Sequence, residues 1–227
     1  MSTPEAGGGR VRGAAVLDIE VYVKPSRQIY YRATELRYAP NDPPKLAPSG
    51  HRYFREGEEN GLHLTEDEDD MWWEVIRRLI RQFPDPDDSQ LQTILSETVM
   101  RTGLVATRLE RVLDLTEAVP LQRAYGVTPA DLRAEKCSMC PEIKDFARKQ
   151  DPSIQGMLVP GTTSERGATV IVFQEWISRC TQVVTDRAQG QHIPISMIQR
   201  SLDLRRFLQL DDPEEDTEEG TEEDLGG

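Results

Sequence analysis

Long hydrophobic runs are missing from this sequence of 227 residues, of which 37% are hydrophobic and 6% aromatic. No apolar stretch approaches the roughly 20 residues that cross a bilayer. Residues 1–13 are glycine-rich and lack the apolar segment of a signal peptide. These absences exclude a membrane-spanning helix and predict a soluble, cytoplasmic protein with a disordered stretch over residues 1–13.

Cysteine is also scarce. The chain has three cysteines, an odd number without secretory context, which favours reduced thiols over a disulfide framework. Cys137 and Cys140 have the spacing of zinc ligands, but no second pair follows to complete four ligands. We therefore expect no metal site.

Basic residues are outnumbered, at 27 against 40 acidic residues and a formal charge of −13. This balance argues against nucleic acid or an anionic membrane surface as the main partner. From Asp211 onward there are ten acidic residues and no basic residue, which leaves residues 1–210 near −3. We expect an acidic disordered tail over residues 211–227 and one folded domain over residues 14–210, whose nearly neutral body can still attract a small anion.

Hydrophobic periodicity predicts an α+β domain with a small, mostly antiparallel β core flanked by helices. Thr65 and Glu68 have capping-box spacing before an amphipathic helix that ends ahead of Pro84. Thr128 and Asp131 mark a second helix start, which Pro141 should later break or kink. The other expected elements are strands over 15–23, 29–34, 109–115, 156–159, 168–174 and 193–204, helices over 89–101 and 116–125 with Gly103 and Gly126 as stops, and a long loop over 38–61.

Two arginines and one carboxylate stand beside aromatic residues in three short segments, Tyr30-Tyr31-Arg32, Ser49-Gly50-His51-Arg52-Tyr53 and Trp72-Trp73-Glu74-Val75. If the fold brings them together, they form a site for a phosphorylated sugar with one acid at its reacting carbon. Guanidinium groups can hold phosphate through paired, charge-assisted hydrogen bonds. On spacing alone, Glu74 with Arg77 and Arg78 fits an exposed helix face with surface ion pairs better than a site.

The ordered set of these motifs, followed by Val112-Leu113-Asp114-Leu115-Thr116 and Gln155-Gly156-Met157-Leu158-Val159-Pro160, resembles the RES-domain family over roughly residues 29–204. The resemblance implies a fold similar to ADP-ribosyltransferase toxins and cleavage of the nicotinamide–ribose bond of NAD. It implies that Arg32, Arg52 and Glu74 are catalytic-site residues. It also implies that the chain is the toxin of a toxin–antitoxin pair, with an antitoxin that blocks the site.

The binding residues expected on this basis are Tyr31, Arg32, Arg52, Tyr53, His63, Thr163 and Ser164, with NAD as the substrate. The chain departs from the residues that the family often has around its site at Ala33, His63 and Tyr53-Phe54. Three alternatives follow: attack by water or phosphate, mono-ADP-ribosylation of a macromolecule, and a non-catalytic protein that binds a nucleotide or a partner. Homo-oligomerisation stays open.

Overall fold

The computed structural model describes residues 23–42, 53–83, 86–117, 126–133, 140–161 and 167–210, without the side chains of residues 129, 133 and 205–210. The segments expected to be disordered, residues 1–13 and 211–227, lie outside this part of the chain. Within it, no helix is both long and apolar enough to cross a membrane.

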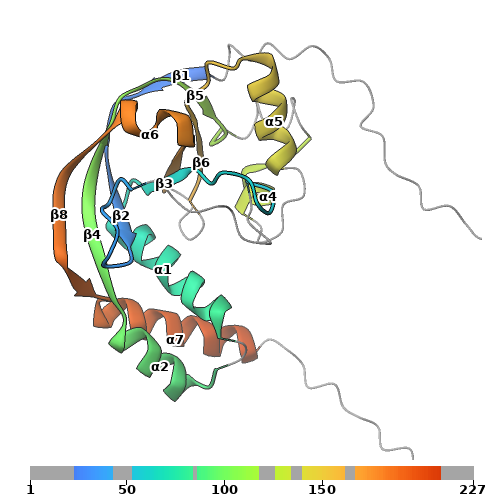
Figure 1. Ribbon diagram of the computed structural model, residues 1–227. Coiled ribbons are helices and arrows are strands. Elements are labelled where there is room, and N and C mark those ends of the chain that lie inside the picture. Colours follow the sequence, from blue (N-terminus) through green and yellow to red (C-terminus); the bar gives the residue numbers. More distant parts are fainter. Residues whose placement is uncertain are drawn as a thin grey trace, which may run out of the picture.

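One eight-stranded sheet organises the described residues (Figure 1), in the order β1-β5-β6-β7-β3-β2-β4-β8. All neighbouring strands pair antiparallel except β5 and β6. The strands are β1 Val23–Ser26, β2 Ile29–Thr34, β3 Leu62–Thr65, β4 Val99–Thr107, β5 Leu109–Asp114, β6 Gly156–Pro160, β7 Ala168–Val172 and β8 Thr181–His192. The helices are α1 Glu68–Gln82, α2 Asp88–Glu97, α4 Pro129–Arg133, α5 Cys140–Gln150, α6 Gln174–Cys180 and α7 Ile195–Leu210.

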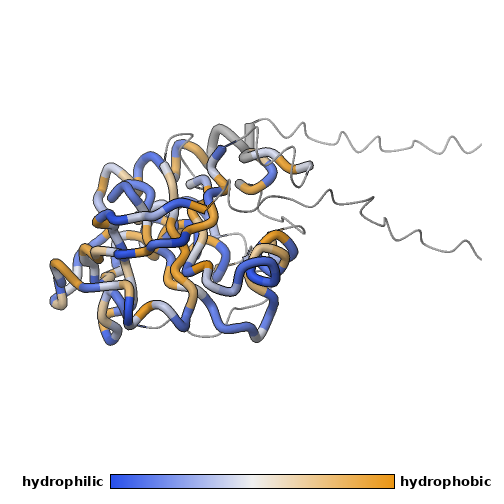
Figure 2. The backbone as a smooth tube through the Cα atoms, turned by 90° about the horizontal axis from the view of Figure 1, so that it is seen from above, coloured by the Kyte–Doolittle hydropathy of each residue, from blue (hydrophilic) through white to orange (hydrophobic). Residues whose placement is uncertain are grey.

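The helices cover the sheet in groups, and each group encloses a part of the core. In Figure 1, α1, α2 and α7 gather near one end of β2, β4 and β8, whereas α4 and α5 lie beside β6. The first group packs around Trp72, Ile76 and Met197, and the second around Ile143, Met157 and Phe173. Hydropathy alternates over short distances along the chain (Figure 2), as expected for strands and helices with one buried face.

Several elements form where the periodicity predicts them. The expected strand over residues 29–34 is β2, and the strands over 156–159 and 168–174 are the antiparallel pair β6 and β7. The predicted cap of α4 is also present, because the Thr128 hydroxyl accepts from the Asp131 backbone N–H at 3.2 Å while Asp131 accepts from Thr128. The fold class is therefore confirmed as single-domain α+β.

Helix α1 begins two residues later than the predicted capping box. Asp67, rather than Thr65, is its N-cap, and its carboxylate accepts from the backbone N–H groups of Asp69 and Asp70. The Thr65 hydroxyl instead donates to the carbonyls of Tyr31 and Asp67. Pro141 lies in the first turn of α5, where proline is tolerated, and residues 134–139, which precede this helix, lie outside the described residues.

Two larger predictions are wrong. The helix expected over 89–101 ends at Glu97, and Gly103 is not its stop but lies inside β4, where a Cβ atom would come within 2.5 Å of Pro40 Cγ. The strand expected over 193–204 is part of helix α7. The residues of both segments are compatible with a helix and with a strand, so packing against distant parts of the chain decides which structure forms.

The cysteine prediction also needs correction. Cys140 is disulfide-bonded, whereas Cys180 is free and buried. The strand expected over 15–23 reaches the described residues only at Val23, where β1 begins, and residues 118–125 of the helix expected over 116–125 lie outside them.

Candidate functional site

Strands β2 and β3 separate in the middle of the sheet. The register joins them at one position, Tyr31 opposite Thr65, whereas β2 pairs with β4 along its whole length. Continuing the antiparallel register would set Leu64 opposite Arg32 and His63 opposite Ala33. Residues 32–34 and 62–64 therefore border an interruption of the sheet, which we call the β2–β3 separation.

Arg32 lies on the β2 side of this separation. Its side chain is half-buried, and its Nη1 atom is buried without a hydrogen-bond partner in the part of the chain that the structure describes. Burial, only partly offset by Asp42 and reinforced by the positive charge of Arg78, lowers the pKa of Arg32 to about 10. An incompletely satisfied buried cation is costly, and a bound anion would relieve that cost.

Arg78 of α1 is the second cation of the site. The side chain is exposed as a whole, yet burial of its guanidinium lowers its pKa, against the influence of Glu35 and Glu74. Its Nη2 atom lies 3.9 Å from Met100 Sδ, which directs it over the end of β4. Sequence reasoning treated Arg78 as a surface partner of Glu74 and missed its place beside Arg32.

Glu74 lies one helical turn before Arg78 and is exposed on α1. Helix α1 packs against β2, so Glu74 and Arg32 are connected through the shared electrostatic neighbour Arg78. Two further carboxylates are near the arginines: Glu35, which pairs with Arg37 at 2.7 Å, and Asp42, which accepts from the Ala39 backbone N–H. Two of the three predicted catalytic-site residues, Arg32 and Glu74, thus share Arg78 as an electrostatic neighbour.

Tyr31 and His63 also flank the separation. Tyr31 is half-buried against the core cluster formed with α1, α2 and α7. Thr65 of β3 lies opposite Tyr31, and His63 shares a face with Thr65 because residues two apart on a strand point the same way. Arg32, the next residue along β2, has Asp42 and Arg78 as its charged neighbours. The ring of Phe54 lies 6.3 Å from the ring of His63, centroid to centroid, at an angle of 55°.

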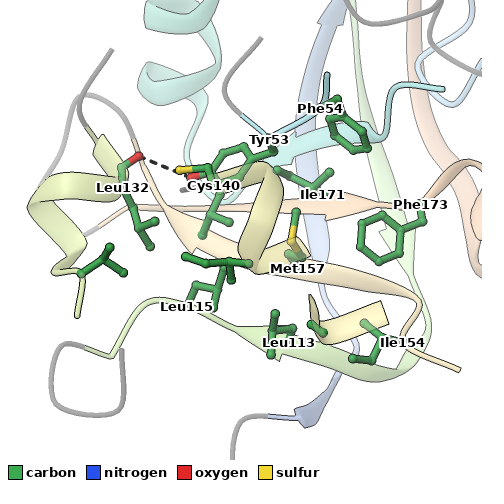
Figure 3. Close-up of a cluster of buried hydrophobic side chains, with 14 residues drawn as sticks. Tyr53, Phe54, Leu113, Leu115, Leu132, Cys140, Ile154, Met157, Ile171 and Phe173 are labelled. Carbon is green, nitrogen blue, oxygen red and sulfur yellow. Dashed lines mark hydrogen bonds between the residues drawn. The ribbon is translucent and has the colours of Figure 1, made fainter. Parts of the chain in front are cut away.

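Tyr53 is a core residue in this structure. It is 3% exposed, and its hydroxyl donates to the carbonyl of Leu132 at 3.4 Å, as the dashed line in Figure 3 shows. Its ring packs among buried side chains such as Ile171 and Cys140 (Figure 3). The structure therefore does not bring Tyr53 to the β2–β3 separation.

Arg52, Thr163 and Ser164 lie outside the described residues, so their expected roles stay predictions. Among the residues that are described, no three His, Cys, Asp or Glu side chains form a group suited to a metal ion. The described part of the candidate site thus comprises two arginines, one exposed carboxylate, one tyrosine and one histidine around the interruption of the sheet.

No protein-family model and no curated protein sequence matches the chain. A solved structure does. The fold is similar to a chain from the crystal structure of the M. tuberculosis MbcT–MbcA toxin–antitoxin complex, with a TM-score of 0.60 and 18% sequence identity over 80% of this chain and 93% of that one. The chain therefore has the same fold as a component of a toxin–antitoxin complex.

Proposed function

We propose that this protein is an NAD-consuming enzyme of the RES type, which binds NAD at the β2–β3 separation and breaks its nicotinamide–ribose bond. The observation that carries the proposal is that Nη1 of Arg32, near Arg78, is buried and has no hydrogen-bond partner among the described residues. The two cations repel each other and burial disfavours the charge of each, whereas a pyrophosphate supplies two negative charges and several acceptor oxygens.

Arg32 and Arg78 position the dinucleotide and do not react with it. Each charge-assisted hydrogen bond to a phosphate oxygen contributes on the order of 1.5–3 kcal/mol. The planar guanidinium group can make two such bonds in parallel, which fixes the orientation of the ligand as well as its affinity. Holding the pyrophosphate in this way presents the attached ribose to groups on α1 and β3.

Glu74 stabilises the positive charge that develops on the ribose. As the bond between C1′ and the nicotinamide nitrogen breaks, its electron pair returns to the ring, and nicotinamide leaves as a neutral base without a general acid. The ribose becomes oxocarbenium-like, and a nearby carboxylate favours this transition state over the ground state. An oxygen of water or phosphate then bonds to C1′, and water releases its proton to solvent.

The toxin role and the antitoxin partner are part of the same proposal. A fold shared with a component of the MbcT–MbcA toxin–antitoxin complex supports a toxin-like activity that a partner protein restrains. An enzyme that depletes a cofactor needed throughout metabolism would require such restraint.

The experiment is to incubate the purified chain with NAD and to measure free nicotinamide. We expect release by the wild type, and Glu74→Gln should slow it by on the order of 10²–10³, the usual effect of removing a preorganised charge stabiliser. Glu97→Gln is the matched control, because Glu97 is also an exposed helical glutamate but lies on α2. Binding of NAD without any release would instead identify a binding protein.

A further inference from the structure

Lys144 on α5 is a buried lysine outside the site described above. It is 4% exposed, and its Nζ is ion-paired with Glu58 and lies 3.4 Å from Asp145 Oδ1. Buried ion pairs are often replaceable by apolar residues without loss of stability. Packing alone therefore does not explain why a lysine occupies this position.

The charge of Lys144 lies over an aromatic ring. Its Nζ is 4.6 Å from the centroid of Phe54, within the range of a cation–π interaction. Phe54 is itself 4% exposed and lies close to Gly61, where an added Cβ atom would meet Phe54 Cζ at 3.0 Å and Ile171 Cγ2 at 2.5 Å. The absence of a side chain at position 61 thus lets the Phe54 ring approach the beginning of β3.

The Phe54 ring also neighbours the ring of His63. The Phe54 and His63 rings are 6.3 Å apart, so the ring that Lys144 contacts is also a neighbour of the imidazole at the β2–β3 separation. Lys144, Phe54 and His63 form a continuous row from α5 to the candidate site, which we call the Lys144 row. At Phe54 and His63 the chain also departs from the pattern of the RES-domain family, which it resembles. The Lys144 row shows that these two positions are neighbours in space.

Ion pairs hold the segment that carries Phe54. Glu58 accepts from Lys144 and, at 3.0 Å, from the backbone N–H of Arg55. Arg55 also pairs with Glu58 at 3.3 Å and with Asp145 of α5. Burial opposes ionisation of Glu58, yet the hydrogen bonds from Lys144 and Arg55 keep its pKa below the ordinary value. The turn over residues 53–58 is therefore attached to α5 by charges at both of its sides.

We propose that Lys144 is a positioning residue, which holds Phe54 against His63 and thereby orients the His63 imidazole for a hydrogen bond to the ribose of the bound dinucleotide. The inference rests on the proposed function for the identity of the ligand. Imidazole can donate or accept a hydrogen bond, and its orientation decides which ligand atom it reaches. Lys144 touches no reacting atom and acts through Phe54.

The test compares Lys144→Met, which keeps the aliphatic stem without the charge, with Lys144→Arg, which keeps a cation able to lie over Phe54. We expect Lys144→Met to lower kcat for nicotinamide release by roughly tenfold to a hundredfold, the scale of a misplaced catalytic group, with KM changed less than about threefold. It should also shift the NMR signals of the His63 ring, which the neighbouring Phe54 ring influences. Lys144→Arg should restore both.

Arg148→Met is the control. Arg148 lies on the same helix and makes the same kinds of contact, a cation–π interaction with Phe173 at 4.7 Å and an ion pair with Glu175, but none with Phe54 or His63. It should leave kcat and the His63 signals unchanged. Phe54→Leu removes the ring and retains Lys144, so it should reproduce the Lys144→Met result and serves if Lys144→Met fails to fold.

The proposal is overturned if Lys144→Met or Phe54→Leu changes thermal stability but leaves both kcat and the His63 signals as in the wild type. A wild-type protein that releases no nicotinamide would refute the proposed function instead. The His63 signals then still decide whether Lys144 positions the imidazole, so the two failures are distinguishable.

Discussion

Replacing Arg32 by methionine should make the ligand-free protein more stable and abolish its ligand binding. Methionine retains an unbranched apolar stem that can occupy the path of the arginine, while the guanidinium and its solvation requirement disappear. The prediction is unusual because most substitutions of a half-buried residue destabilise a protein.

The magnitude follows from the electrostatics of the site. The pKa of Arg32, near 10, lies well below that of free arginine, which corresponds to a cost of roughly 3 kcal/mol for keeping the side chain charged in the fold. Solvent still reaches part of the side chain, which reduces the gain to about 1–3 kcal/mol. For a chain of this size, that is a rise in Tm of roughly 2–10 °C.

Thermal unfolding at neutral pH, with and without ADP-ribose, measures both parts of the prediction. ADP-ribose should raise the Tm of the wild type, because a ligand that binds only the folded state stabilises it, and should not raise that of Arg32→Met. Arg101→Met is the matched control, since Arg101 lies on the neighbouring strand β4 but is satisfied by Asp186, at 2.7 Å from Nε and 2.5 Å from Nη2.

Arg101→Met should lower Tm, because it removes two charge-assisted hydrogen bonds. Opposite signs for the two variants would show that Arg32 is held at a cost in stability, as binding sites often are. If Arg32→Met lowers Tm as Arg101→Met does, Arg32 has partners that satisfy it, and the reasoning for an anion site at the β2–β3 separation fails.

Two further predictions concern the frame of the site. Asp67→Ala removes the N-cap of α1, the helix that carries Glu74 and Arg78, and should lower the free energy of unfolding by about 1 kcal/mol, measured by urea denaturation. The pKa of Glu58 is lowered in the folded state. Its ionised form therefore stabilises the fold at pH values above the unfolded-state pKa of about 4.3, and this stabilisation is lost as the pH falls through the folded-state pKa. The Tm of the wild type should therefore exceed that of Glu58→Gln at pH 7, and the difference should shrink toward zero below about pH 4; a difference that persists at pH 3 would contradict it.

Local sequence predicted the elements whose side-chain period is unambiguous. The apolar spacing of α1 and the alternation in β2 indicate their structure without tertiary information, since each buries one face. Residues 99–101, expected in a helix, lie in β4, and residues 195–204, expected in a strand, lie in α7. In each, the pattern fits helix and strand alike, and contacts with distant elements, β8 for the first and α1 and α2 for the second, decide between them.

The sequence by itself determined the concentration of acidic residues from Asp211 onward, the helix that carries Glu74 and the strand that carries Arg32, because charge and periodicity are properties of neighbouring residues. Only the tertiary structure decided that Arg78 belongs beside Arg32, that Tyr53 is buried in the core, and that Lys144 reaches His63 through Phe54. These relations join residues far apart in the chain, and their energies arise from burial and close approach, which no local pattern records.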